Sequence, residues 1–444
     1  DPPDNWPIFH LFHPDKDLGA PYDPNSAIYY KGRYHLHYIY RNRAGISYAH
    51  VSSVDMVRWK WHPTVLVPQA NRHGMFSGTA FLTMEGKPAH AYCGWGSNRN
   101  WIQHALDDKL DKWSKPEVML PIDETGKLMV NEPYFDPDVW IMDGRYYGLN
   151  GRSSHQSPLI MKSENLKDWE HIGELLHPDF DEEKLGVKKE EDISCPNFFK
   201  LGDKWVLTCI SHRLGCRYFI GDFKDEKYLP EYHAVMGGNS RRYFAPESLQ
   251  TPDGRRVNWS WFINGNGKDH RGTQSLPTEM SLNSKNQMRF RPIQELETLR
   301  HEKKEKSMIL VKSDVTQAID DMLGDHCEIR LEIEKSGNKS FGIDVLCNDE
   351  GTDGLRIQVN REKNLLEVGD QNGDFILHSN ERLSLRIFVD AGLVEVFANE
   401  KQVVMADKKR PAGSQIKNRI ALFSRGSELL IDRLSFWKMK SAYN

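Results

Sequence analysis

Short stretches of alternating apolar and polar residues recur along the first three-fifths of the chain, and each pair of stretches is separated by a glycine turn. Alternation with a period of two is typical of half-buried β-strands. Glycine supplies the positive φ that tight hairpin loops require. The turns recur at intervals of about 52 to 58 residues, at Gly32, Gly86, Gly144, Gly202 and Gly254. The pattern therefore predicts five successive β-rich modules.

A second motif repeats in phase with the hairpins. The segments SSVDMVRW, DDKLDKW and SENLKDW end at Trp59, Trp113 and Trp169, and each is interpreted as the turn and outer strand that close a module. Repeated β-modules of this length are typical of a propeller, whose circular arrangement leaves few exposed strand edges. We therefore expect a five-bladed β-propeller over residues 1–292.

The pattern changes after the fifth module. Ile293, Leu296 and Leu299 are spaced as on one face of a helix, which predicts a linker helix over 293–304. Many short alternating segments follow, with a hairpin turn at Asp390-Ala391-Gly392, and this spacing is typical of a two-sheet sandwich. The fold prediction is thus all-β: a five-bladed propeller, a linker, and a β-sandwich over 305–444.

Composition and charge narrow the choice of function. The 444-residue chain has a net charge of −4 with both signs interspersed, which argues against nucleic acid as a partner. No apolar run approaches the ~20 residues that span a bilayer, so no membrane partner is expected. The six cysteines form no CxxC pair and no Cys/His cluster at zinc spacing, so we expect no metal and no cofactor. The chain begins at Asp1 without a visible signal peptide, and an extracytoplasmic location is nevertheless expected. The oligomeric state stays open.

Polar residues just before each glycine hairpin would converge, because the first strand of every propeller blade lines the central channel. Carboxylates crowded there repel one another, so at least one should have a raised pKa. Glycoside cleavage needs one carboxylate to attack or to activate water, and one carboxylic acid to protonate the leaving oxygen. The predicted channel residues are Asp23, Asn25, Phe76, Ser77, Asp136, Asp138, Asp192, Ser194, Asn197 and Glu247.

Several of these segments together resemble the β-fructofuranosidase family of glycoside hydrolases (invertases, levanases and inulinases). The matching segments are YDPNS, GRYHLHYIY, FSGTA, FDP, SCP, PIQELETLR and LRIFVDAGLVEVF. The resemblance implies a propeller followed by a sandwich, and an exo-acting, retaining hydrolase of fructofuranosides or a related furanoside. It assigns Asp23 as the nucleophile and Asp136 as the stabiliser of the sugar-ring transition state. The substrate is expected to be an oligosaccharide or polysaccharide, bound by Tyr22, Asn25, Ile39, Phe76, Ser77, Trp95, Phe135 and Ser194.

Four positions depart from the family pattern. Tyr22 replaces an Asn, Ile39 a Gln and Phe135 an Arg, which puts fructoside specificity in question. Ser194 replaces the acid/base Glu, and a serine hydroxyl cannot serve as a general acid near neutral pH. Asp192 or Glu247 is expected to take over this role. Glu247 is preferred because its longer side chain can reach across a channel.

Two other functions remain open from the sequence. The first is a catalytically silent carbohydrate-binding propeller that keeps the pocket without the acid. The second is an inverting hydrolase similar to the arabinan-degrading propellers. Carboxyl groups about 5–5.5 Å apart indicate retention of configuration, whereas a separation of about 6.5–9.5 Å indicates inversion.

Overall fold

The computed structural model describes residues 6–14, 21–131, 134–151, 157–264, 272–408 and 418–443. Almost all regular structure in these residues is β-strand, which confirms the all-β prediction. The helical elements are short: α1 (Pro68–Asn71), α2 (Glu182–Leu185) and the 3-10 helix η1 (Gln294–Leu299). No helix among the described residues is long and apolar enough to span a bilayer.

Five sheets follow one another along residues 24–292, and each opens with an antiparallel hairpin. The first contains β1 (Pro24–Tyr30), β2 (Arg33–Asn42), β3 (Gly45–Ser53) and β4 (Lys60–Trp61). The second contains β5 (Gly74–Leu82), β6 (Pro88–Trp95), β7 (Arg99–His104) and β8 (Glu117–Val118). The third contains β9 (Pro121–Ile122), β10 (Phe135–Met142), β11 (Arg145–Gly151), β12 (Leu159–Ser163) and β13 (Trp169–Glu174). The fourth contains β14 (Ser194–Leu201), β15 (Lys204–Ser211), β16 (Gly215–Lys224) and β17 (Lys227–Val235). The fifth contains β18 (Tyr243–Gln250), β19 (Arg256–Phe262), β20 (Thr273–Gln274), β21 (Thr278–Leu282) and β22 (Met288–Pro292).

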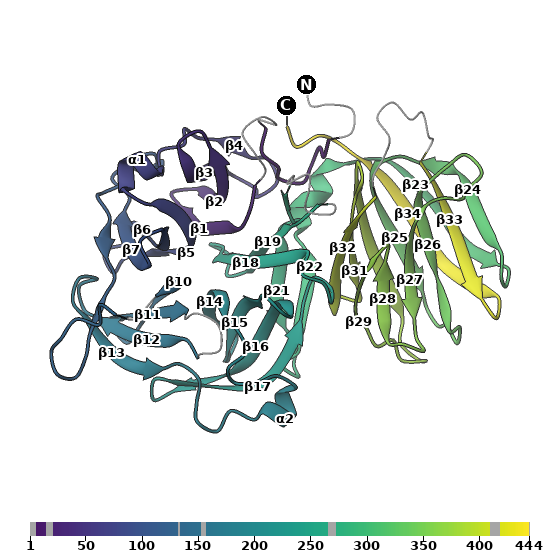
Figure 1. Ribbon diagram of the computed structural model, residues 1–444. Helices are drawn as coiled ribbons and strands as arrows, with labels where there is room; N and C mark the ends of the chain where they lie inside the picture. Colours follow the sequence, from purple (N-terminus) through teal and green to yellow (C-terminus); the bar gives the residue numbers. More distant parts are fainter. Residues whose placement is uncertain are drawn as a thin grey trace.

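The first strands of these sheets lie around a common centre (Figure 1). Each contacts the next in the order β1, β5, β10, β14 and β18, and β18 contacts β1. The five predicted glycine turns all connect the first and second strands of a sheet, and all five glycines have positive φ. An added Cβ would meet nothing within 4 Å at these turns, so backbone conformation, not space, explains the glycines.

Two six-stranded sheets form the C-terminal part, and they pack face to face (Figure 1). One contains β23 (Arg300–Val311), β25 (His326–Ile333), β30 (Leu383–Asp390), β31 (Leu393–Ala398), β32 (Gln402–Asp407) and β34 (Leu429–Met439). The other contains β24 (Thr316–Leu323), β26 (Ser340–Cys347), β27 (Leu355–Asn360), β28 (Leu365–Val368), β29 (Gln371–Asp374) and β33 (Arg419–Arg425). Buried aliphatic and aromatic side chains from both sheets form one core.

The linker prediction over 293–304 is wrong in length and helix type. The helix is the 3-10 helix Gln294–Leu299, and β23 begins immediately at Arg300. Leu296 and Leu299 are buried, as their spacing predicted. The charged stretch after Leu299 forms β23 and pairs with β34. The hydrogen bonds of this pairing stabilise the strand more than the local preference for a helix stabilises a helix.

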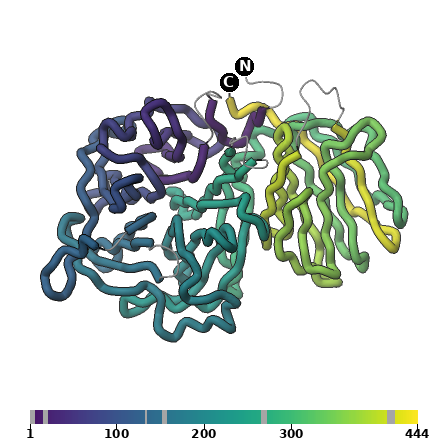
Figure 2. The backbone as a smooth tube through the Cα atoms, viewed as in Figure 1, coloured from purple at the N-terminus to yellow at the C-terminus, as the bar shows by residue number. Residues whose placement is uncertain are grey.

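A buried polar cluster joins the N-terminal segment to the C-terminal sheets. The backbone N–H groups of Ile8, Phe9 and His10 donate to the Asp390 carboxylate at 2.7–3.0 Å. The His10 ring contacts Asp390 at 2.9 Å and Glu395 at 3.1 Å, and all three side chains are fully buried. The N-terminal segment also lies beside the C-terminal end of the chain, where the Ala442 N–H donates to the Ile8 carbonyl (Figure 2). These contacts fix the two parts of the molecule against each other.

Candidate active site

A β-bulge lies near the start of the first strand in each of the five N-terminal sheets. In four of them the bulge contains a non-glycine residue with φ between 42° and 49°: Ser26, Asp136, Cys195 and Ala245. Bulges redirect side chains and are frequent beside active sites. A positive φ is sterically costly for a residue with a Cβ, so such strain is a pointer to function. The bulges thus lie near the starts of the five strands that contact one another in sequence.

Asp23 and Asp136 meet through Cys195 near the starts of these strands. The Ser77 hydroxyl donates to Asp23 Oδ2 at 3.0 Å, and the Cys195 thiol lies 3.6 Å from the same oxygen. The Cys195 backbone N–H donates to Asp136 Oδ2 at 2.9 Å. Ser77, Asp136 and Cys195 lie on the first strands of three sheets, and Asp23 directly precedes the first strand of a fourth. The fold therefore brings together three of the residues that the sequence placed in the site.

Burial governs the charge of the two carboxyl groups. The pKa of Asp136 is raised to about 6: burial is the largest cause, the charges of Asp23 and Asp192 add to it, and the hydrogen bond from the Cys195 N–H opposes it. Burial also raises the pKa of Asp23, while hydrogen bonds from Ser77 and Cys195 oppose that increase. Carboxylates poised in this way are typical of functional sites. The raised pKa that the sequence analysis predicted is present in both groups.

Ser194 is hydrogen-bonded to Asp192, and Asp192 in turn binds a histidine that the sequence analysis missed. The Ser194 hydroxyl donates to Asp192 Oδ1 at 2.6 Å. His212 Nδ1 lies 2.5 Å from Asp192 Oδ2, and the His212 backbone N–H donates to the same oxygen at 3.0 Å. Burial would raise the pKa of Asp192, but the hydrogen bonds from Ser194 and His212 outweigh it and lower the pKa. The predicted rise in pKa does not occur at this residue.

The His212 side chain is 74% exposed and projects from the turn between β15 and β16. Its ring lies edge-on to Phe244, with centroids 5.9 Å apart. No local signal could have identified His212, because it follows Ser194 by an entire hairpin and reaches Asp192 only through the pairing of β14 with β15. Cys195 was visible in the Ser-Cys-Pro motif, but its contact with both carboxylates depends on the arrangement of the sheets.

Aromatic side chains lie near the starts of the first strands. Tyr22 packs edge-on against Trp261 at 5.3 Å, and Trp261 also contacts Phe244. On another side, Phe76 packs against Trp95 at 4.9 Å, and Trp95 is 53% exposed. Flat aromatic faces of this kind suit the apolar faces of sugar rings. Phe135 is partly exposed at the start of β10, beside Asp136.

Asn25 and Ile39, like Ser77, are buried and contact neighbouring groups of the protein. Asn25 is 2% exposed, donates to the Asp23 carbonyl at 2.8 Å and accepts from the Gly78 N–H at 2.8 Å. Ile39 is 3% exposed and lies in a core cluster that supports Tyr22 and Phe76. Asn25 thus holds the segment that carries Asp23, and Ile39 supports the neighbouring aromatic side chains, while contact of either residue with a substrate stays a prediction. Alternation along a strand could not reveal this, because both faces of β2 are covered.

Glu247 belongs to a separate polar group around Asp138 and Arg256. It is 3% exposed, and its Oε1 accepts the Ala27 backbone N–H at 2.7 Å. Burial raises its pKa well above the ordinary range, with a further contribution from the Asp138 charge. Arg256 donates to Asn197 at 3.0 Å in the same group. Among the described residues, no hydrogen bond of Glu247 reaches Asp23, Asp136 or Ser194.

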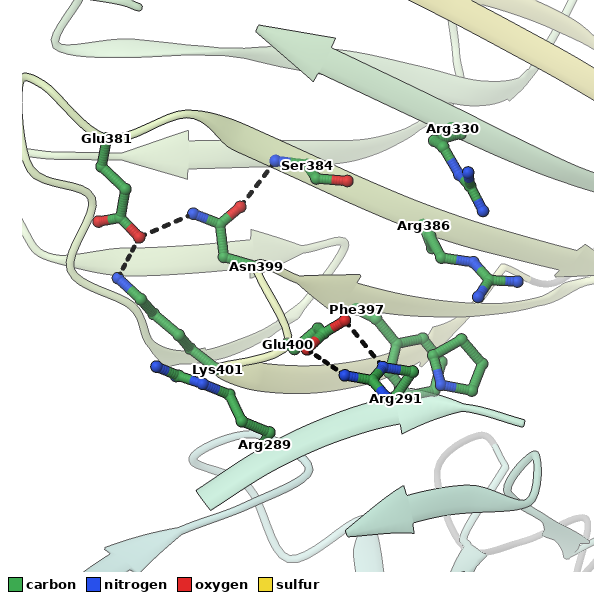
Figure 3. Close-up of a pocket in the computed structure, with 11 residues that line it drawn as sticks. Arg289, Arg291, Arg330, Glu381, Ser384, Arg386, Phe397, Asn399, Glu400 and Lys401 are labelled. Atoms are coloured by element: carbon green, nitrogen blue, oxygen red, sulfur yellow. Dashed lines mark hydrogen bonds and ion pairs between the residues drawn. The ribbon is translucent and has the colours of Figure 1, made fainter. Parts of the chain in front are cut away.

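A cavity of about 450 Å³ lies elsewhere, at the junction of β22 with the C-terminal sheets (Figure 3). Its lining is rich in cationic side chains, and two of them pair with carboxylates that also line it: Arg291 with Glu400 at 2.9 Å, and Lys401 with Glu381 at 2.5 Å. None of the carboxylates in the bulge region lines it. Nucleophilic and acidic groups converge at the channel, so we place the candidate active site there.

Comparison with known proteins agrees with this architecture. Residues 12–292 match the Glycosyl hydrolases family 32 N-terminal domain, and residues 295–438 match the Glycosyl hydrolases family 32 C terminal region. The chain is 25% identical to the sucrose-6-phosphate hydrolase of Zymomonas mobilis, over 97% of this chain and 92% of that protein. It is 24% identical to the levanase of Bacillus subtilis, over 95% of this chain and 69% of the levanase. The crystal structure of fructan 1-exohydrolase IIa from Cichorium intybus has a TM-score of 0.82 at 18% identity, covering 100% of this chain and 99% of that one.

Proposed function

The chain belongs to glycosyl hydrolase family 32, and we propose that it hydrolyses the glycosidic bond of fructofuranosides. The observation that carries the proposal is the pair of buried carboxyl groups, Asp23 and Asp136, which share contacts with Cys195. Retaining cleavage of a glycosidic bond requires a carboxylate nucleophile, which Asp23 would supply, and a separate acid for the leaving oxygen. The relatives named sucrose-6-phosphate hydrolase and levanase support a fructoside as the substrate.

In the proposed reaction, a carboxylate oxygen of Asp23 attacks the anomeric carbon of the fructosyl unit. The bond to the leaving oxygen breaks, and a covalent fructosyl-enzyme forms. Asp136 stabilises the positive charge that develops on the ring in the transition state. Water then attacks the same carbon and releases Asp23 and fructose, so the configuration is retained. The Ser77 hydrogen bond supports this role because it favours the ionised form of Asp23.

We assign protonation of the leaving oxygen to the Asp192–His212 pair. Asp192 accepts a hydrogen bond from Ser194, which occupies the position of the family acid/base. The negative charge of Asp192 also contributes to the raised pKa of Asp136. The lowered pKa keeps Asp192 ionised, so Asp192 cannot donate the proton itself and instead holds the His212 ring by a hydrogen bond. Imidazole is the side chain that most often acts as a general acid or base in enzymes. Glu247 is the alternative acid, because its raised pKa keeps it protonated.

The domain organisation is part of the proposal. The ring of contacts between first strands supports a five-bladed propeller over residues 1–292, followed by a β-sandwich that starts at Arg300. We therefore place the start of the sandwich at Arg300 rather than at residue 305, because β23 pairs with β34 from Arg300 onward. The extracytoplasmic location stays a prediction, and all six cysteines are free.

The test is release of fructose from sucrose, sucrose 6-phosphate, inulin and levan, with an aryl β-fructofuranoside for comparison. Asp23→Asn should abolish release from every substrate. Asp192→Asn and His212→Asn should reduce release from the natural substrates by about 10²–10⁴-fold and spare the aryl glycoside, whose leaving group needs no proton. Glu247→Gln should leave both activities nearly unchanged.

Three results would contradict parts of this scheme. If Glu247→Gln shows the selective loss instead, Glu247 is the acid. If the natural substrates bind calorimetrically but are not turned over, and arabinofuranosides are not cleaved either, the chain is a carbohydrate-binding protein. If arabinofuranosides alone are hydrolysed, with inverted configuration, the fructoside assignment fails.

A further inference from the structure

A row of histidines crosses the first sheet, away from the carboxylate pair. His37 on β2 is the cross-strand partner of His50 on β3, and the His62 backbone N–H donates to the His50 carbonyl at 2.9 Å. The three rings are stacked or close to it, with centroids 4.4 Å apart for His37 and His50 and 4.1 Å apart for His50 and His62. The row ends at Asp111, which comes from the segment between β7 and β8 of the second sheet.

His50 and His62 direct the same type of nitrogen at one carboxylate oxygen. His62 Nδ1 lies 2.8 Å from Asp111 Oδ1, and His50 Nδ1 lies 3.4 Å from it. The ligand atoms of all three residues lie within 4.8 Å of one another. Ligand atoms bound about 2.1 Å from a tetrahedral zinc ion are about 3.4 Å apart, and slightly less in octahedral geometry. The observed separations therefore match the edges of a coordination polyhedron.

The remaining nitrogen of each histidine already has a partner that would orient a metal ligand. His50 Nε2 lies 2.9 Å from His35 Nδ1, and His62 Nε2 lies 2.7 Å from the Ser52 hydroxyl. Metal-binding histidines almost always have such a hydrogen bond on the second nitrogen. His50 is 3% exposed, yet its Nδ1 has no hydrogen-bond partner among the described atoms. This buried nitrogen thus has the Asp111 carboxylate 3.4 Å away without a hydrogen bond to it, and a metal ion bound to both groups would satisfy them.

We propose that His50, His62 and Asp111 bind a divalent transition-metal ion. Two neutral imidazoles and one carboxylate carry a single negative charge and suit zinc, with copper, nickel and iron as competitors. The Asp111 side chain is 23% exposed, so water can complete the coordination. The ion would join β3 and the end of β4 to the neighbouring sheet. These two sheets also carry Asp23 and Ser77, and the proposal is independent of the reaction assigned to them.

The test uses full-length, untagged protein that is treated with EDTA and dialysed. Titration with zinc chloride in a calorimeter should give one strong site per chain. The thermal unfolding midpoint should rise when zinc is in excess, because an ion that binds only the folded state stabilises it. Cobalt chloride should give visible d–d absorption bands typical of four or five nitrogen and oxygen ligands.

Asp111→Asn and His62→Gln remove a ligand at the edge of the cluster and should weaken zinc binding by at least about tenfold. His177→Gln is the matched control, because His177 lies 3.7 Å from Asp179 in the segment after β13, and no third ligand group joins this pair in the part of the chain that the structure describes. It should bind zinc as the unchanged protein does. The proposal is overturned if the unchanged protein binds no zinc, or if both ligand variants bind it with unaltered affinity. If those variants do not fold, the cobalt spectrum of the unchanged protein decides, and weak bands of hexa-aqua type count against the site.

Discussion

Replacing Asp136 by Asn should make the protein more stable at pH 7 while abolishing catalysis. The folded state holds this carboxyl with a pKa of about 6, against an ordinary value of 3.8. At about 1.36 kcal/mol per pKa unit, keeping it ionised at pH 7 costs the folded state about 3 kcal/mol as an upper value. Asn has no charge to desolvate, and its Oδ1 can still accept the Cys195 N–H. A destabilising catalytic carboxylate is a common trade of stability for activity.

The sign of the pH dependence distinguishes this cause from simple repacking. Because the pKa of Asp136 is raised on folding, the folded state binds more protons between about pH 3.8 and pH 6. The gain in stability from Asp136→Asn should therefore be full above pH 6 and vanish near pH 4. Urea unfolding followed by tryptophan fluorescence at both pH values would measure it. Asp203→Asn, in an exposed turn, is the control. A loss of stability at pH 7, or a gain that does not change with pH, would refute the reasoning.

Further predictions concern catalysis and the junction of the two parts. The acid limb of kcat/KM should lie near pH 6, where Asp136 takes up a proton, and a limb below pH 5 would contradict the value. Asp23→Asn should lower kcat by several orders of magnitude with an unchanged circular dichroism spectrum; near-normal turnover would remove Asp23 from the nucleophile role. Hydrogen bonds with Asp390 and Glu395 outweigh burial and raise the pKa of His10 to about 9, so its contribution of about 3 kcal/mol is complete below pH 6.5 and lost as pH rises through 9. His10→Gln should remove that loss from the stability profile, and a variant that keeps it would exclude His10 as the cause.

The repeated and local features of the fold could be predicted from the sequence. The glycine turns follow from backbone conformation, which is a property of a few adjacent residues. The convergence of Asp23 and Asp136 could be inferred because each lies at the start of a first strand. Their motifs were also sufficient to indicate the family, despite the change at Ser194.

The remaining errors have a common physical origin in contacts between segments far apart in the chain. The pairing of β14 with β15 brings His212 to Asp192, and no pattern within either segment encodes it. The packing of Ile39 against Met75 and Tyr92 of the next sheet is also absent from the pattern along β2. Likewise, the residues of the histidine row belong to separate strands and a loop of the next sheet, so spacing along the sequence could not suggest a metal site.

The bulge at the start of each first strand links the architecture to the chemistry. The same bulge with a positive φ occurs at Ser26, Asp136, Cys195 and Ala245, and the side chain at that position determines which groups it contacts. At Asp136 the bulge directs a carboxyl group inward, and at Cys195 it presents an N–H to that carboxyl group. The residue before the bulge is Ser194 in one sheet and Phe135 in another, so the same backbone position is polar or apolar as the sheet requires. Because the repeat provides the strained backbone, the bulge is present with a serine at position 194, and the turn that carries His212 lies beside it through the contact with Asp192.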